Sequence, residues 1–150
     1  MCSPTPRATS SACCAAACDL PAGRCGSVRS VARIFTLDEA GSLMPEVLEH
    51  ARAFVAVRAD LAELTHDLRQ AGTSALGGLA EAKGLEARMD EILSWFDAEE
   101  IEIKGVAPLL VDFPAVLGGV SVRLCWLEGE TALGWYHRSD LGFPGRRPLP

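Results

Sequence analysis

Apolar residues recur at steps of three or four from Leu37 onward, the spacing that places side chains on one face of an α-helix. This stripe consists of Leu37, Ala40, Met44, Val47, Ala51, Phe54, Val57, Leu61, Leu64 and Leu68. Thr36 and Glu39 stand three residues apart at its start and form the pattern of a capping box, so we expect the helix to begin there. Pro45 falls inside the stripe and predicts either a kink or a separate short turn over residues 37–44.

A second helical stripe follows a glycine-rich break over about residues 71–78. Its positions are Leu79, Ala82, Leu85 or Glu86, Met89, Ile92, Leu93 and Phe96, with Gly84 weakening the middle. The two stripes predict an antiparallel helical pair that buries them as core. An exposed coiled-coil face that receives a partner is the alternative.

The apolar period changes from helical to alternating after Ala98. Short strands are predicted over residues 101–103 and 109–113, and the clearest alternation covers residues 120–127. Gly118-Gly119 and Glu128-Gly129 supply turns on either side of that strand, and the second turn leads into residues 131–137. The predicted fold class is therefore α+β, a long antiparallel helical hairpin followed by a small antiparallel β-meander.

Residues 1–30 are a different kind of chain, rich in Ala, Ser, Cys and Arg and without an apolar period. Such a segment has no face to bury, so we expect a disordered N-terminal extension before a single domain over residues 31–150. Five of the six cysteines lie in the extension, but they lack paired Cys-x-x-Cys spacing and a nearby histidine, which argues against a metal site there. A start at Val28 or Val31 would leave the extension untranslated.

Charge and hydropathy argue against two classes of partner, nucleic acids and membranes. The formal net charge is -6 and no basic stripe is present, which argues against a partner with a phosphate backbone, so we expect no nucleic-acid partner. No apolar run approaches the ~18 residues of a membrane span, so we expect no membrane association. Cys125 is the single thiol outside the extension, which fits a reducing compartment, and we expect a cytoplasmic location.

Seven segments together form a specific pattern along the chain: Arg33–Ala40, Leu43-Met44-Pro45, Leu110–Ala115, Val122–Trp126, Gly129-Glu130, Trp135-Tyr136-His137 and Gly142–Leu149. This pattern resembles a bacterial family catalogued as domain of unknown function 2203. The segments occur in the family's order and spacing over about residues 33–149. The family usually has Trp directly before His, where this chain has Tyr136. The resemblance implies a fold and a bacterial origin, and it implies no activity.

Strand parity predicts a polar face on the sheet. A two-residue loop at Glu128-Gly129 would place Arg123, Cys125 and Tyr136 on one face, opposite Trp126 and Trp135. An acid at position 112 interrupts an apolar run and could join that face. The candidate polar cluster is Asp112, Arg123, Cys125, Glu130, Tyr136 and His137.

Three interpretations of this cluster compete. In the first, Asp112 and Arg123 form a structural ion pair across strands and Cys125 is a small buried residue. In the second, Asp112, Cys125, Glu130 and His137 converge on a metal, although their spacing matches no recognised ligand motif. In the third, Cys125 is a nucleophile with His137 as its base and Asp112 as the orienting group. The predicted parity opposes this last interpretation, because it places His137 on the other face.

No phosphate loop, serine elbow or zinc motif occurs, and no cofactor is expected. Arg146 and Arg147 could bind an anion in a loop, or belong to a solvated tail. His50 and His66 lie off the apolar stripe and are expected in solvent. The leading hypothesis is a small non-catalytic interaction or accessory domain, with a homodimer through the helices or the sheet. The alternative is a small metal- or ligand-binding protein that uses the polar face of the sheet.

Overall fold

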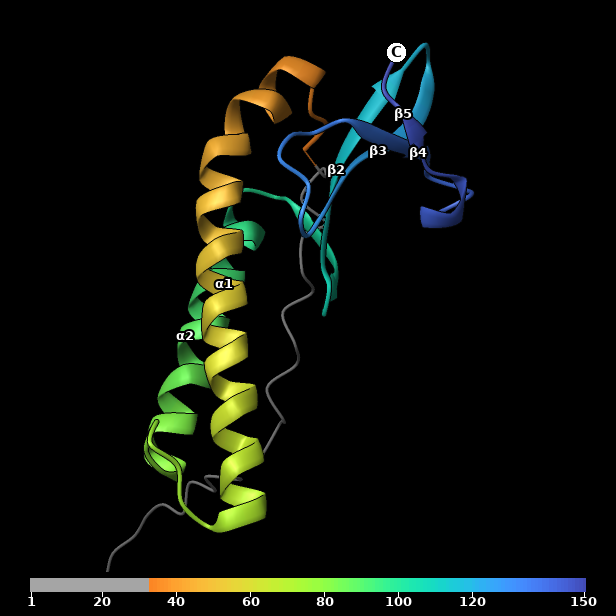
Figure 1. The fold of residues 1–150 in the computed structure, drawn as a ribbon. Coiled ribbons are helices and arrows are strands. Elements are labelled where there is room, and N and C mark those ends of the chain that lie inside the picture. The colour runs from red at the N-terminus through yellow and green to blue at the C-terminus, as the bar shows by residue number, and fades with distance from the viewer. Residues whose placement is uncertain (1–32) are drawn as a thin grey trace, which may run out of the picture. The chain divides into compact units, whose positions relative to one another are not determined.

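The computed structural model describes residues 33–150, so the prediction for residues 1–30 lies outside the described part (Figure 1). Two helices, α1 (Leu37–Ala71) and α2 (Leu79–Ala98), precede a five-stranded antiparallel sheet. Its strands lie in sequence order: β1 (Glu102–Val106), β2 (Leu109–Leu117), β3 (Val120–Leu127), β4 (Trp135–Arg138) and β5 (Arg147–Pro148). A short 3-10 helix, η1 (Phe143–Gly145), precedes β5. The predicted α+β class, helices followed by an antiparallel meander, is confirmed.

Helix α1 begins at the predicted capping box. The backbone N–H of Glu39 donates to Thr36 Oγ1 at 3.2 Å, and the N–H of Thr36 donates to Glu39 Oε2 at 2.8 Å. The helix then runs without interruption through Pro45, so the prediction of a separate turn over residues 37–44 is wrong. Pro45 and Gly41 are both exposed, so the Gly41 carbonyl that the proline leaves without a donor can bond water.

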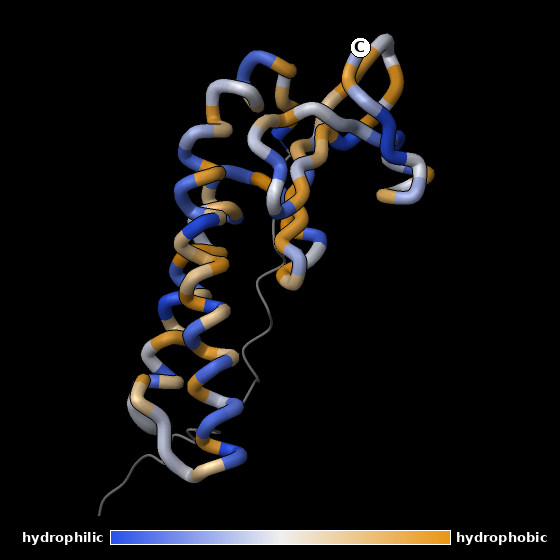
Figure 2. Tube along the Cα trace, viewed as in Figure 1, coloured by the Kyte–Doolittle hydropathy of each residue, from blue (hydrophilic) through white to orange (hydrophobic). Residues whose placement is uncertain are grey.

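The two helices form the predicted antiparallel hairpin, and its sheet-proximal half supplies the core. One apolar cluster joins the two helices to the sheet. Helix α2 contributes Ile92 and Phe96, and the first half of α1 contributes Ala40, Met44, Val47, Ala51 and Phe54. The central strands are mostly hydrophobic, whereas hydrophobic and hydrophilic residues alternate around the helix axes (Figure 2). The far half of the hairpin extends beyond the sheet (Figure 1).

The β2–β3 hairpin turns at Gly118-Gly119 as predicted. Both glycines have positive φ, 57° and 80°, as a two-residue type I′ turn requires. The turn sets the register from Leu117↔Val120 to Leu110↔Leu127. Alternate residues of both strands therefore enter the core, among them Val111, Phe113, Leu124 and Trp126.

Strand β4 departs from the prediction. It begins at Trp135 rather than near residue 131, and it pairs Cys125 with Trp135 and Arg123 with His137. Residues 128–134 form a loop, closed where the Glu130 carboxylate accepts the Leu127 N–H at 2.9 Å. The register differs from the predicted one by an odd number of residues, which exchanges the two faces of β4.

Neither helix in the described part combines the length and apolar character needed to cross a membrane.

Candidate functional site

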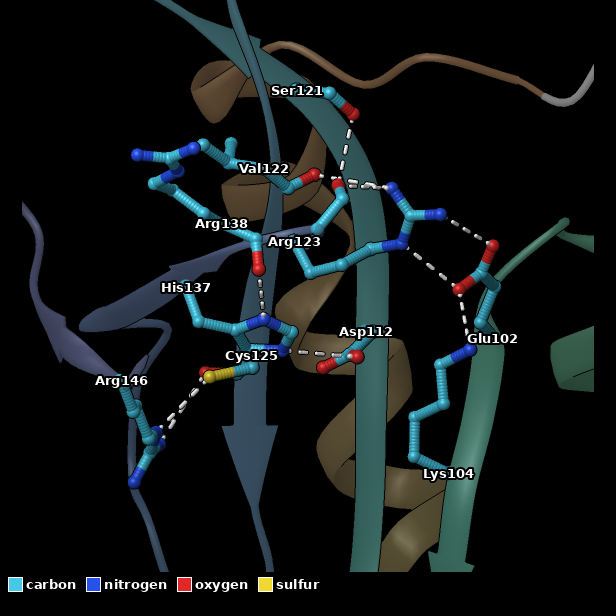
Figure 3. A network of polar contacts seen from close by, with 11 residues as sticks. Glu102, Lys104, Asp112, Ser121, Val122, Arg123, Cys125, His137, Arg138 and Arg146 are labelled. Atoms are coloured by element: carbon cyan, nitrogen blue, oxygen red, sulfur yellow. Dashed lines mark hydrogen bonds and ion pairs between the residues drawn. The ribbon is translucent and has the colours of Figure 1, made fainter. Parts of the chain in front are cut away.

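Three adjacent strands bring Asp112, Cys125 and His137 together on the sheet face opposite Val111 and Leu124 (Figure 3). Asp112 and Cys125 are direct cross-strand partners, and His137 is the diagonal neighbour of Cys125 on the next strand. All three are buried, with exposed fractions of 2% for Asp112, 0% for Cys125 and 4% for His137. One donor atom from each lies within 4.8 Å of the other two.

Hydrogen bonds fix the orientation of the His137 ring. Nδ1 lies 3.0 Å from the Arg138 carbonyl oxygen, which can only accept, so Nδ1 carries a proton. Nε2 therefore faces Asp112, 3.3 Å from Oδ2. The other carboxylate oxygen, Asp112 Oδ1, is buried without any hydrogen-bond partner and is alone in this among buried side-chain nitrogens and oxygens of the described part. The site therefore holds a polar atom that nothing in the fold satisfies.

Burial is the largest influence on the pKa of Asp112 and on that of Cys125. It raises the pKa of Asp112, against the opposing effects of His137 and Lys104. It also raises the pKa of the Cys125 thiol, although Arg146 Nε donates to Sγ at 3.0 Å and works in the other direction. Both groups are held in an environment that disfavours uncompensated negative charge.

Arg123 does not pair with Asp112, and this correction removes the predicted structural ion pair. Its guanidinium bonds Glu102, with Nε 3.0 Å from Oε2, and Ser139, with Nη1 3.0 Å from Oγ. Glu102 also accepts from Lys104 Nζ at 2.8 Å. The sequence prediction lacked this partner because it placed no acid of β1 beside Arg123.

The new pairing predicts a specific pattern of coupling energies. A double-mutant cycle of Glu102→Gln with Arg123→Gln should give about 1 kcal/mol of coupling, because the two side chains are in contact and less than a third exposed. The cycle of Asp112→Asn with Arg123→Gln should give less than about 0.5 kcal/mol. Urea unfolding of each single and double variant measures both. The reverse pattern would restore the Asp112–Arg123 pair.

Two other predicted cluster members lie elsewhere. Glu130 Oε2 bonds Arg146 Nη2 at 2.5 Å and also accepts the Leu127 N–H, so it is held outside the Asp112–Cys125–His137 group. Tyr136 packs against the core on the opposite face, and its predicted place beside Cys125 is wrong. Trp135, predicted to lie on the opposite face with Trp126, shares the face of Cys125 and is 37% exposed. The odd register shift explains both errors.

The arginines of the C-terminal segment have different surroundings. The Arg146 side chain is 14% exposed, bonds Glu130 and Cys125, and lies 4.8 Å from the Trp135 ring centre. Its charge is therefore already engaged, which argues against an anion site there. Arg147 is exposed, with its guanidinium 6.0 Å from the Tyr136 ring centre.

The structure changes the argument against Cys125 as a nucleophile. The register places His137 on the face of Cys125, so the parity argument against that interpretation was wrong. Burial now opposes it, because the Cys125 thiol is fully enclosed, with its pKa raised, and a nucleophile must reach its substrate.

Sequence reasoning also missed features outside the cluster. His50, expected in solvent, stacks on Trp95 with ring centres 3.9 Å apart. A groove of about 540 Å³ lies between α1 and the loop after β3, and no motif marks it. Its lining is mostly apolar: Leu48, Ala51, Arg52, Val55, Ala56, Ala59, Trp126, Glu128, Gly129, Glu130 and Thr131. A second apolar ridge on α1, beside the core stripe, was the signal that could have revealed it.

Comparison with known proteins supplies a family and no activity. Neither the curated proteins nor the solved structures gave a match. The model of an uncharacterised conserved family matches residues 33–149, which is nearly the whole of the described part. The matched span includes α1, the sheet and all three buried residues of the site. The chain therefore belongs to the uncharacterised conserved family DUF2203.

Proposed function

We propose that this chain is a small non-catalytic interaction domain and that a second copy of the chain occupies the groove along α1. The observation that carries the proposal is the groove itself, an apolar concavity beside a helix whose stripe residues from Ala40 to Phe54 are already buried in the core. Enclosure of the Cys125 thiol supports a role other than nucleophilic catalysis. The cytoplasmic location stays a prediction, supported by the single thiol outside residues 1–30.

The groove wall on α1 is a ridge suited to a second helix. Val55 lies two helical turns after Leu48, Ala59 lies one turn after Val55, and Ala56 lies beside them. Val55 and Leu48 are partly exposed, and both alanines are exposed. Small side chains allow a second helix to approach closely, and the larger pair can then interdigitate with their equivalents.

Charge complementarity supports a second copy as the occupant. Arg52 lies on the groove wall, Asp60 lies eight residues further along α1 at the edge nearer α2, and neither forms an ion pair in the described part. In a two-fold contact of antiparallel α1 helices centred at Ala56, Arg52 of one protomer faces Asp60 of the other. The symmetry makes this pair twice, as an isologous interface requires.

Sedimentation equilibrium of the full chain tests the dimer. The wild type should be dimeric, and Val55→Glu should be monomeric, because it buries a charge at the centre of the apolar contact. Ala87→Glu, a matched change at an exposed position of α2, should remain dimeric. Far-UV circular dichroism checks that both variants keep their helices.

A charge exchange tests the geometry. Arg52→Asp and Asp60→Arg should each weaken the dimer at least several-fold, and the double variant should recover it, because the exchanged charges attract across the two-fold axis. A monomeric wild type at the highest attainable concentration would overturn the homodimer. A monomer whose groove binds an apolar fluorescent probe would instead favour a small apolar ligand as the occupant.

A second candidate function is a metal- or ligand-binding protein that uses the polar face of the sheet. The specific observation in its favour is the unpartnered Asp112 Oδ1 beside Cys125 and His137.

A further inference from the structure

The group formed by Asp112, Cys125 and His137 has the composition of a transition-metal site. A carboxylate, a thiolate and an imidazole are the three side-chain donors that zinc takes in proteins. They come from β2, β3 and β4, three hydrogen-bonded strands that fix their relative positions. Glu130, which the sequence placed in the same ligand set, is excluded because Arg146 and the Leu127 N–H hold its carboxylate.

The distances suit coordination better than a salt bridge. Asp112 Oδ2 and His137 Nε2 lie 3.3 Å apart. Two ligands bonded at about 2.0–2.1 Å to a tetrahedral zinc ion are separated by about 3.3 Å. A charge-assisted N–H···O bond between the same atoms would be shorter, about 2.7–2.9 Å. The Cys125 sulfur completes a set of donor atoms that all lie within 4.8 Å of one another.

The surroundings orient the donors as a metal site requires. The Arg138 carbonyl accepts the Nδ1 proton of His137, and Nε2, the ring nitrogen left to bind a metal, is directed at Asp112 (Figure 3). A backbone carbonyl that fixes the tautomer of a ligating histidine is a regular feature of protein metal centres. Asp112 is 2% exposed, and its Oδ1 has no partner in the fold. A bound cation would supply the missing interaction for that carboxylate.

The charges balance for a divalent ion. Asp112 and Cys125 would contribute two negative charges as ligands, and His137 would bind as a neutral imidazole. Arg146 donates to the Cys125 sulfur, but its positive charge is already matched by Glu130 at 2.5 Å. A dication would therefore leave the buried group neutral, whereas ionised Asp112 and Cys125 without one would be two uncompensated buried charges.

The geometry points to a buried binding site for one divalent transition-metal ion of the zinc class, with Asp112, Cys125 and His137 as its protein ligands. Three protein donors leave a fourth position for water or another small ligand. The inference is independent of the proposed homodimer, because the donors lie on β2–β4 and the groove is walled by α1.

Cobalt titration tests the site in the full chain with Cys2, Cys13, Cys14, Cys18 and Cys25 all replaced by serine. Cys125 is then the sole thiol, so a thiolate-to-cobalt charge-transfer band in the near ultraviolet reports this residue alone. One equivalent of Co²⁺ should produce that band together with the visible d–d bands of tetrahedral cobalt, and Zn²⁺ should displace both. Elemental analysis of the same protein, purified without a histidine tag, should find near-stoichiometric metal.

Matched variants locate the ligands. Cys125→Ser should abolish the charge-transfer band, Asp112→Asn should weaken cobalt binding at least tenfold, and His66→Gln, at an exposed histidine of α1, should change neither. Absence of the band in the five-serine parent would overturn the site, whether or not the substituted variants fold. Visible d–d bands of unchanged position and intensity in Cys125→Ser would overturn it as well, because the cobalt would then lie elsewhere. Sedimentation equilibrium on these samples keeps a failure of the metal site distinct from a failure of the dimer.

Discussion

Phe54→Ala should reduce the free energy of unfolding by about 3–5 kcal/mol, because it removes a fully buried ring from the contact between α1 and the sheet. Phe54 is 0% exposed, and Ile92 and Phe96 of α2 are buried in the same cluster. Neighbouring side chains cannot collapse fully into the space of a lost phenyl ring, so a cavity remains. Urea denaturation followed by far-UV circular dichroism measures the difference.

Leu37→Ala is the matched control, because both residues belong to one apolar stripe in the sequence. Leu37 is 40% exposed, so its replacement by alanine should lower the free energy of unfolding by less than about 1 kcal/mol. Equal losses for the two variants would mean that the stripe is buried along its whole length in solution, contrary to the structure. A small loss for Phe54→Ala would mean that α1 does not pack on the sheet as described.

Glu128→Gln should cost about 1–2 kcal/mol at neutral pH. Glu128 accepts two hydrogen bonds from Arg58, at 2.9 and 2.7 Å, and a third from the Leu109 N–H at 2.7 Å. The Arg58–Glu128 pair connects α1 to the end of β3. Both side chains are about a quarter exposed, so the pair stabilises the fold less than a fully buried pair would. Glutamine can still accept from Leu109 but loses the charge. Urea denaturation of both proteins gives the difference.

The difference between the wild type and Glu128→Gln should depend on pH. The hydrogen bonds from Arg58, followed by that from Leu109, hold the pKa of Glu128 below its ordinary value of about 4.3. A group whose pKa is lower in the folded state stabilises the fold above its unfolded pKa and loses that contribution as the pH falls through the folded pKa. The two proteins should therefore converge in stability as the pH falls from about 4.3 through the lower pKa of folded Glu128. Glu86→Gln, which removes an exposed partner of Lys83, should show no measurable difference at any pH. A pH-independent gap for Glu128→Gln would contradict the charged pair.

The candidate site shows where prediction from sequence stopped. Alternation in β3 identified Arg123 and Cys125 as neighbours on one face, and the out-of-phase acid in β2 correctly joined them. The position of β4 was wrong, because a two-residue turn was assumed at Glu128-Gly129. Trp126 Nε1 and the Leu127 N–H instead bond the carbonyl and the carboxylate of Glu130, and these contacts close a wider loop. An odd change of register then exchanged Tyr136 with His137, and with them the chemistry of the face.

The sequence by itself determined the local features of this protein. The capping box at Thr36, the helical stripes and the double-glycine turn before β3 each depend on residues close together in the chain, so each could be predicted from short-range pattern. Tertiary structure alone decided which partners the charged groups take. Arg123 pairs with Glu102, Arg58 with Glu128, and Asp112 with His137, across separations of 21, 70 and 25 residues. No local pattern fixes such distances, because they follow from how strands and helices pack after their registers are set.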